Sequence, residues 1–572
     1  MNIQENKKQK IFVWIWIMCL VAFVLLTRFY RLGDLPEKMH IDEVSVAVNA
    51  YNIAYYGTDA SGNSWPVYFL NFNGGQSAAY TYLLALCIKL FGLSAWTIRL
   101  PSAVCGVLFI WIGMRLLQEL LVGKHISLSG KPFSKLGVGL VGASLMAIMP
   151  YFIHISRLGM DCNLMMPAVT LSLLITVRAV KQKRTGLWIL AGICWGLSLY
   201  TYALSYLMIP LFFVLFFLYL IRCHQFKFKN AVLMLLPVIV IAWPLMVYVA
   251  VGTFGLNMTH IGVFSLPKMF VWRGSEFTVA NVLDNFQRMF LGLLGIEATG
   301  TNTIVGIGVF YPFSVLLYLL GMEEIVRKEI RYRKAPVFRV ETVLLLQNIS
   351  VWLVGLFLDN MDSIGRINGK MFSVFSIAVY GGYRACKLLV PFVKKRSSSI
   401  MAISSVCIIL LGHFGLFWVQ YEKQFTQEER AYFYGYCATD LQQAVDLNAE
   451  TPVYWDMYSL RDWKYFEVCF ELSADEFNEQ GFVRQTEEGQ DQRNLQYDPD
   501  RWVWRNVRFG ISYTEARTQA ATFVVFPQHT DLIQILDARK DLQRVYDKDY
   551  LVYKPVNLQL RGEGGASDAD LR

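Results

Sequence analysis

Long apolar runs recur along the first 420 residues and are separated by short polar segments. Five clear examples are Ile11 to Leu26, Leu187 to Tyr200, Ile209 to Ile221, Ala231 to Val251 and Ile400 to Val419. Alone or with their flanks, they are long enough to cross a hydrocarbon core of about 30 Å. No comparable run follows Tyr421. The pattern predicts a polytopic α-helical membrane domain over residues 1–420 and a soluble region after it.

The soluble region shows a mixed pattern. A helix-like stretch, Glu428 to Leu447, precedes short β-rich segments at Pro452 to Trp455, Thr522 to Phe526 and Leu551 to Tyr553. We therefore predict a small α/β domain over residues 421–560. The tail at 561–572 is rich in Gly, Asp and Ala, which favours disorder.

Basic residues near helix ends mark the cytoplasmic side of a membrane protein. Six basic clusters can all lie inside if the stretch Ala78 to Phe91, at roughly 14 residues, is an outer interfacial helix rather than a crossing. The N-terminus is then cytoplasmic and the C-terminal domain extracytoplasmic. About eleven crossings are expected, near 11–27, 100–122, 137–153, 163–179, 187–203, 205–221, 231–250, 302–321, 341–358, 370–390 and 400–420.

Composition and charge agree with this division. Of 572 residues, 55% are hydrophobic and only 17% are charged, which is too apolar for a soluble protein of this length. The region from Tyr421 onward contains 17 Lys and Arg and 27 Asp and Glu, which gives a net charge of −10. The remainder of the chain has a net charge of +19. The short cytoplasmic loops contain no nucleotide-binding motif, and nothing indicates a nucleic-acid partner.

The ten cysteines have no metal-type spacing, and most lie in apolar runs. Only Cys437 and Cys469 fall in the soluble region. They could pair if this region is extracytoplasmic, and the spacing leaves that question open.

The first outer loop places His40, Asp42 and Glu43 just before Val44 to Tyr56, which we interpret as an amphipathic helix. One interpretation is structural, with Asp42 capping the helix and Glu43 interacting with its dipole. The other is catalytic, because a carboxylate at a membrane surface can take a proton from an attacking hydroxyl or amine. Residue types alone favour the structural interpretation.

The order and spacing of several motifs resemble a known superfamily. These are Arg31-Leu-Gly-Asp-Leu-Pro, then His40-Ile-Asp42-Glu43, and then Tyr80 through Arg99-Leu-Pro-Ser-Ala. They resemble the GT-C glycosyltransferases of the protein O-mannosyltransferase and aminoarabinose transferase superfamily, glycosyltransferase family 39. The resemblance implies a GT-C fold with outer juxtamembrane helices, Asp42 as catalytic base, and Glu43 positioning that base or the acceptor. It covers about the first 220 residues well.

One departure from the family pattern affects the substrate entrance. Many members have a Pro-Pro pair before the surface helix, whereas this chain has Gly74-Gly75-Gln76-Ser77.

Two further outer loops carry candidate substrate-binding residues. Arg157 and Asp161, four residues apart, are either an ion pair between helices or part of the site, and the resemblance favours the site. Arg366 and Asn368 lie in a loop resembling the motif at which relatives meet the lipid phosphate, and guanidinium suits phosphate. His40 is a further candidate for substrate binding, and Lys89 and Arg99 are weaker candidates for binding the phosphate.

The implied function is an inverting transfer of a hexose or pentose from a polyprenyl-phosphate donor at the outer face of a plasma membrane. The acceptor is a protein, a lipid or a cell-wall glycan. No cofactor is required, although the resemblance allows a divalent metal with unknown ligands. A flippase or transporter of lipid-linked sugars is the alternative, and a non-catalytic surface protein with a membrane anchor is a further one.

Overall fold

The protein is described by a computed structural model. It describes residues 3–556 except for 37–38, 72–73, 123–133, 269–277, 295–306, 360–363, 390–395, 424–432, 435–438, 448, 457–465, 467–468, 471–502, 528 and 548–549. The predicted tail at 561–572 and Cys437 lie outside the described residues.

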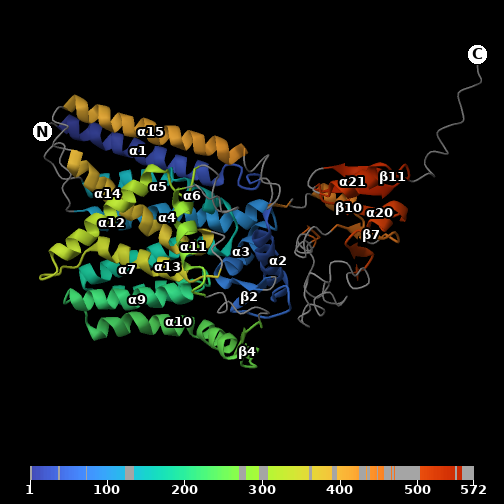
Figure 1. The fold of residues 1–572 in the computed structure, drawn as a ribbon, viewed down its shortest axis with the longest axis horizontal. Coiled ribbons are helices and arrows are strands. Elements are labelled where there is room, and N and C mark those ends of the chain that lie inside the picture. Colours follow the sequence, from blue (N-terminus) through green and yellow to red (C-terminus); the bar gives the residue numbers. More distant parts are fainter. Residues whose placement is uncertain are drawn as a thin grey trace, which may run out of the picture.

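Long helices run roughly side by side and form the larger part of the molecule (Figure 1). A helix is present at each predicted crossing. These helices are α1 (Ile3–Phe29), α4 (Ala95–Leu121), α5 (Lys135–Ala147), α7 (Met165–Gln182), α8 (Thr185–Ser198), α9 (Ser205–Arg222), α10 (Phe228–Phe254), α12 (Phe313–Arg331), α13 (Val340–Leu356), α14 (Met371–Leu389) and α15 (Arg396–Lys423). Among the described residues, six helices are long and apolar enough to cross a membrane, or seven if one bent pair is counted. The number of eleven crossings stays a prediction.

Two predicted crossings differ from the observed helices. The segment predicted at 137–153 bends by 74° between α5 and the short helices α6 (Pro150–His154) and η1 (Ile155–Arg157). Pro150 starts the new helix because proline cannot continue the old hydrogen-bond ladder. The segment predicted at 302–321 starts later, since α12 begins after Pro312 and runs to Arg331, into a cluster predicted to be a loop.

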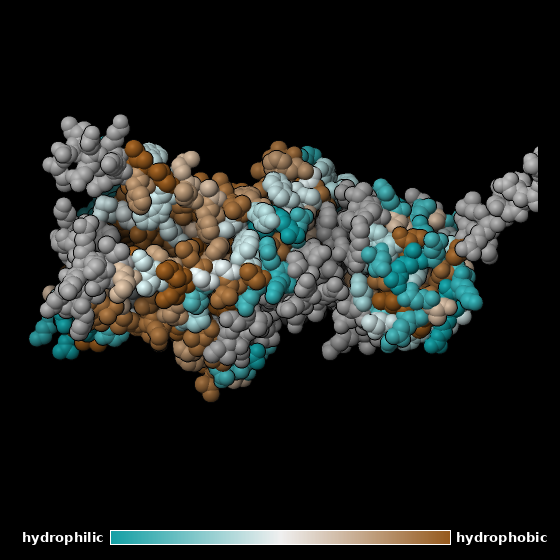
Figure 2. Space-filling view, turned by 90° about the horizontal axis from the view of Figure 1, so that it is seen from above, coloured by the Kyte–Doolittle hydropathy of each residue, from teal (hydrophilic) through white to brown (hydrophobic). Residues whose placement is uncertain are grey.

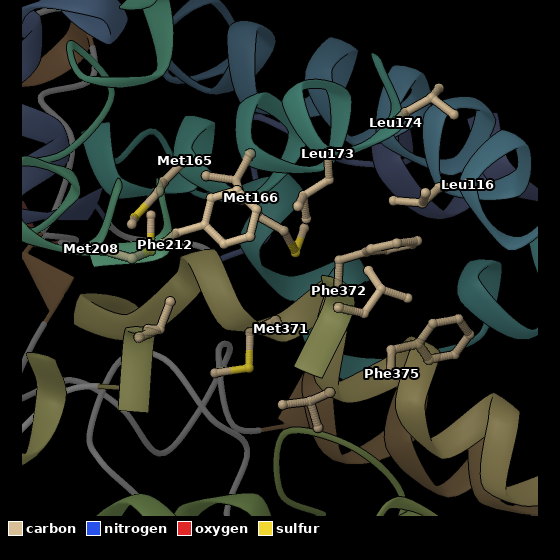
Figure 3. Packing of buried hydrophobic residues seen from close by; sticks show 14 of the residues in the cluster. Leu116, Met165, Met166, Leu173, Leu174, Met208, Phe212, Met371, Phe372 and Phe375 are labelled. Carbon is tan, nitrogen blue, oxygen red and sulfur yellow. The ribbon is translucent and has the colours of Figure 1, made fainter. Parts of the chain in front are cut away.

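The core of the helical part combines aliphatic side chains with methionine and aromatic ones. Residues of α4, α7, α9 and α14 interdigitate there, among them Leu116, Met166, Phe212 and Phe375 (Figure 3). The helices α12 and α14 approach so closely that a Cβ on Gly381 would lie 1.8 Å from the carbonyl oxygen of Leu317. Small residues allow such contacts between membrane helices.

The outside of the helical part is apolar. Brown residues cover much of it in Figure 2, whereas the C-terminal domain is largely teal. The helices α1 and α15 lie side by side (Figure 1), with the rings of Phe23 and Phe414 5.2 Å apart. Both expose large apolar side chains, such as Trp14 on α1 and Ile408 on α15. Such a surface fits lipid as its solvent.

Short elements gather at the end of the bundle that faces the C-terminal domain (Figure 1). They are β1 (Met39–His40), α2 (Ile41–Tyr56), β2 (Tyr68–Asn71), β3 (Gly74–Ser77), α3 (Ala78–Phe91), η2 (Asp161–Leu164), β4 (His260–Ile261), β5 (Phe264–Ser265) and η5 (Ile364–Lys370). We call this region the outer end. A further helix, α11 (Val282–Leu294), packs against α13. The helix predicted at Ala78 to Phe91 is confirmed with its bounds, as α3. Its place at the membrane surface stays a prediction.

The helix α2 departs from the prediction. It begins at Ile41 rather than Val44, and every residue from Glu43 to Ala50 is buried. The prediction of an amphipathic helix there was wrong, because the small and branched residues of this stretch pack on all sides.

The C-terminal domain contains a six-stranded mixed sheet in the order β11-β12-β10-β7-β9-β8. Its central strand β7 is parallel to both β10 and β9. Alternate residues of β10 join two apolar clusters, so both faces of the sheet are covered. The elements are α16 (Thr439–Ala444), β7 (Val453–Trp455), β8 (Val503–Trp504), β9 (Val507–Phe509), α20 (Tyr513–Thr518), β10 (Thr522–Val525), α21 (Thr530–Asp537), β11 (Leu542–Asp547) and β12 (Leu551–Pro555).

The three predicted strands of this domain are confirmed, as β7, β10 and β12. Of the predicted helix Glu428 to Leu447, the described residues contain only the short α16. Cys469 is disulfide-bonded, and the eight cysteines outside this domain are free thiols. The boundaries at 420 and 560 stay predictions.

Candidate active site

The N-terminus of α2 is capped by His40 rather than by Asp42. The Asp42 backbone N–H donates to His40 Nδ1 at 3.1 Å, and the His40 N–H donates to Glu43 Oε2 at 2.9 Å. This reciprocal arrangement satisfies N–H groups that a helix start leaves without partners. The structural interpretation of Asp42 as the helix cap was therefore wrong, and its carboxylate is not used for capping.

Glu43 is fully buried and joins three segments. Its carboxylate pairs with Arg99 of α4, with Arg99 Nε 3.0 Å from Oε1, and it also accepts the Gly159 N–H at 2.6 Å. The Arg99 guanidinium donates further to the carbonyls of Leu32 and Pro36. Both side chains of the pair are 0% exposed. Glu43 and Arg99 thus fix the start of α2 against the rest of the outer end.

Asp42, the neighbouring carboxylate, has a very different environment. Its side chain is 42% exposed, and its nearest side-chain donor is Asn71 Nδ2, 3.4 Å from Oδ1. The residue is held instead by its backbone, because Gln76 Nε2 donates to the Asp42 carbonyl at 3.0 Å. A fixed backbone with an accessible carboxylate is the arrangement that a general base needs.

Asp161 is brought to the same region by the hairpin of β2 and β3. Its Oδ2 accepts the Ser77 N–H at 2.8 Å, and its Oδ1 accepts the Cys162 N–H at 2.7 Å. The consecutive residues Gln76 and Ser77 therefore bind the two aspartates. The alternative of an ion pair between Arg157 and Asp161 gains no support, because the ion pairs of the described residues do not include this one. The role of both residues in the site stays a prediction.

The hairpin also accounts for the departure from the Pro-Pro pattern. A Cβ on Gly75 would lie 2.3 Å from the ring of Tyr68, whose hydroxyl donates to the Gly75 carbonyl. A proline at position 77 would lack the N–H that Asp161 accepts. Gly74-Gly75-Gln76-Ser77 is therefore a strand that carries the link between the two aspartates.

Arg157 is not in the environment expected of a phosphate ligand, because it binds backbone carbonyls. Its guanidinium donates to the carbonyls of Thr27, Tyr30, Arg31 and Leu35, at the end of α1 and in the turn beyond it. Carbonyls at a helix C-terminus are unsatisfied and carry partial negative charge. The expected role in phosphate binding gains no support, because these carbonyls use its two terminal nitrogens.

The last outer loop is tied to the second one through Asn368. Its Nδ2 donates to the Cys162 carbonyl at 3.1 Å, and its Oδ1 accepts the Tyr151 hydroxyl. Cys162 is adjacent to Asp161, so hydrogen bonds run from Asp42 through β3 and η2 to η5. Arg366 is partly buried on η5.

Lys370, at the end of η5, is the cation that sequence reasoning missed. It is fully buried, its Nζ lies 3.8 Å from the centre of the Trp352 ring, and this Nζ makes no hydrogen bond within the described residues. A charge buried without an ionic partner is costly, and such charges are often found at functional sites. The sequence feature that could have identified it is a lysine at the start of an apolar run. Lys89, in contrast, is exposed and lies over the Tyr55 ring.

The donor set for a metal is incomplete in the described part of the chain. No three His, Cys, Asp or Glu side chains come together there in a way that could hold an ion. The described residues therefore supply no complete set of protein ligands for the divalent metal that the resemblance allowed.

Comparisons with known proteins agree with this architecture. Residues 76–249 match the family described as dolichyl-phosphate-mannose-protein mannosyltransferase. No curated protein sequence matches the chain. The crystal structure of ArnT from Cupriavidus metallidurans bound to undecaprenyl phosphate is similar with a TM-score of 0.55 at 14% identity, covering 94% of this chain and 97% of that one. The apo ArnT structure from the same organism gives 0.56 at 13% identity, with the same coverage.

The protein therefore has the fold of a GT-C membrane glycosyltransferase. The family match over residues 76–249 and the fold shared with ArnT both support the resemblance to the protein O-mannosyltransferase and aminoarabinose transferase superfamily that was seen in the sequence.

Proposed function

We propose that the protein transfers a sugar from a polyprenyl-phosphate donor to an acceptor on the extracytoplasmic side of the membrane, with Asp42 as general base. The observation that carries the proposal is the contrast at the start of α2. Glu43 is buried and paired, so that it fixes the backbone, while the Asp42 carboxylate beside it is 42% exposed. The matched mannosyltransferase family and the ArnT fold support the reaction class.

In the proposed reaction, an acceptor hydroxyl or amine attacks the anomeric carbon of the sugar while Asp42 takes its proton. The bond between that carbon and the phosphate oxygen breaks on the opposite side, so the configuration inverts. The electron pair and the negative charge go to the lipid phosphate. Preorganised cations stabilise charge that develops in a transition state.

Lys370 and Arg366 are the cations best placed for this phosphate. Both lie on η5, which Asn368 joins to the loop of Asp161. Lys370 is buried without a hydrogen-bond partner in the described residues, so a phosphate would supply the missing acceptor. We retain Arg366 from the family motif and add Lys370 from its environment. Lys89 stays a weaker candidate.

The orientation in the membrane is part of the proposal. Basic clusters put the N-terminus in the cytoplasm. The short elements of the outer end lie together at the opposite end of the bundle, beside the C-terminal domain (Figure 1). The disulfide at Cys469 suits an oxidising, extracytoplasmic compartment.

The test is transfer of labelled sugar in proteoliposomes containing the full chain, a set of polyprenyl-phosphate sugars and a crude acceptor fraction. We expect the labelled sugar to appear in the acceptor fraction and free polyprenyl phosphate to be released in an equal amount. Movement of the intact donor across the bilayer without transfer would instead establish the flippase alternative. Neither transfer nor movement with any donor would contradict both.

A further inference from the structure

The segment between α15 and the C-terminal sheet forms a strand with the first outer loop. This strand, β6 (Phe433–Tyr434), pairs antiparallel with β1 (Met39–His40). Met39 lies opposite Tyr434, and His40 lies opposite Phe433. In the described residues the two strands form a sheet of their own. The start of the C-terminal region is therefore in backbone contact with the residue that caps α2.

The strand β1 contributes to the position of Asp42, in addition to the contacts of Glu43 and Gln76. His40, the second residue of β1, accepts the Asp42 N–H on its side chain and donates its own N–H to Glu43. A displacement of β1 would therefore break the cap and move the first turn of α2. Within the described part of the chain, β6 is the only strand that pairs with β1.

We propose that β6 is a positioning element for catalysis. Its backbone pairing holds β1 in place, so that the first turn of α2 presents the Asp42 carboxylate to the acceptor. The C-terminal region then completes the catalytic site in addition to any contact with the acceptor. The inference rests on the proposed function in taking Asp42 as the base.

The register identifies which backbone groups carry the pairing. In antiparallel strands, pairs that exchange hydrogen bonds alternate with pairs whose N–H groups point away from the partner strand. The His40 N–H is directed to Glu43, which makes His40 and Phe433 the pair without mutual hydrogen bonds. Met39 and Tyr434 are then the hydrogen-bonded pair. The pairing of β6 with β1 therefore depends on the Tyr434 N–H and not on the Phe433 N–H.

Proline substitutions separate these two groups, because proline has no N–H. The full chain is assayed in proteoliposomes as Tyr434→Pro, with Phe433→Pro and Tyr434→Ala as matched controls. We expect Tyr434→Pro to lower kcat about tenfold or more with the donor KM unchanged, since small displacements of a catalytic group have large effects on rate. Both controls should stay close to the native rate. Equal losses in the two proline variants, or no loss in Tyr434→Pro, would overturn the proposal.

Amide hydrogen exchange tests the pairing without an activity assay. In the native full chain in detergent, the Met39 and Tyr434 amides should exchange slowly. Exchange at the rate of an unstructured peptide would overturn the proposal. This result stands even if Tyr434→Pro fails to fold or if no donor supports transfer, so failure of the inference and failure of the proposed function can be told apart.

Discussion

The outer end and the C-terminal sheet use ion pairs in opposite ways. At the outer end, Arg99 and Glu43 are both 0% exposed and are held by additional backbone hydrogen bonds. In the C-terminal domain, Asp541 pairs with Arg539 while 57% of its side chain is exposed. Arg544 similarly pairs with Asp537 and Asp547 at the surface.

The difference teaches which charges hold the structure and which are available for chemistry. Breaking a buried pair leaves an uncompensated charge away from water, whereas breaking a surface pair leaves a solvated one. Asp42 at the outer end is accessible although Ile41 and Glu43, its neighbours along the chain, are buried. Substitutions should therefore separate stability from activity between two adjacent residues.

The largest effect on stability is expected from Glu43→Ala. It leaves Arg99 buried without its partner, which destabilises a protein by about 3–5 kcal/mol. Thermal unfolding in detergent, followed by size-exclusion fluorescence, should show a large fall in Tm or aggregation. Asp42→Asn is the adjacent control and should unfold like the native protein. A Tm for Glu43→Ala close to that of the control would contradict the role assigned to the buried pair.

Lys370→Met should change binding and stability in opposite directions. Losing charge-assisted hydrogen bonds to a phosphate weakens binding by about 1.5–3 kcal/mol, so the Kd for polyprenyl phosphate should rise at least tenfold. Removing an unpaired buried charge should leave Tm unchanged or raise it. Lys387→Met, at an exposed position of α14, is the control. Unchanged lipid affinity in Lys370→Met would remove this residue from the phosphate site.

Gly75→Ala should have an intermediate effect. The added methyl group would meet the Tyr68 ring and the Phe69 carbonyl oxygen at 2.3 and 2.6 Å, and overpacking typically destabilises by about 1–3 kcal/mol. Because β3 carries the links to Asp42 and Asp161, transfer should fall together with Tm. Gly186→Ala is a matched control, since a Cβ there meets nothing within 4 Å. Equal behaviour of the two variants would argue against the close packing of the hairpin.

Asp541→Asn should have the smallest effect. Its hydrogen bond with Arg539 lowers the pKa of this carboxyl, so its contribution to stability is present above the unfolded pKa and is lost as the pH falls through the lower folded value. For an exposed pair the contribution is about 0.5 kcal/mol or less. Unfolding curves of the native chain and the variant should differ slightly at neutral pH and coincide in strong acid. A large difference at neutral pH would contradict the surface environment.

The fold followed from the sequence where one physical signal dominated. Hydrophobic runs gave a helix at each expected crossing, and short segments rich in β-forming residues gave β7, β10 and β12. The bend at Pro150 and the late start of α12 were missed, because run length was weighed above the prolines at 150 and 312. The burial of α2 was missed because periodicity cannot show what packs against a helix.

The candidate site was predictable only in part. The resemblance located Asp42, Asp161 and Asn368 in one region, but not their partners. The hydrogen bonds from Arg157 to backbone carbonyls and the capping of α2 by His40 depend on tertiary contacts. No local sequence pattern encodes such contacts. The roles of Gln76 and Ser77 had one signal in the sequence, the absence of the family's Pro-Pro pair. The hairpin of β2 and β3 explains that departure. The pairing of β6 with β1 joins segments from opposite ends of the chain and had no signal in the sequence.

The measurement that tests the central claim most directly is sugar transfer by Asp42→Asn beside Asp34→Asn, an exposed aspartate of the same loop. Both variants should insert and unfold like the native protein. We predict that transfer falls by about 10²–10⁴-fold in Asp42→Asn, the range for losing a general base, and stays near the native rate in Asp34→Asn. Transfer at the native rate in a folded Asp42→Asn protein would contradict the account.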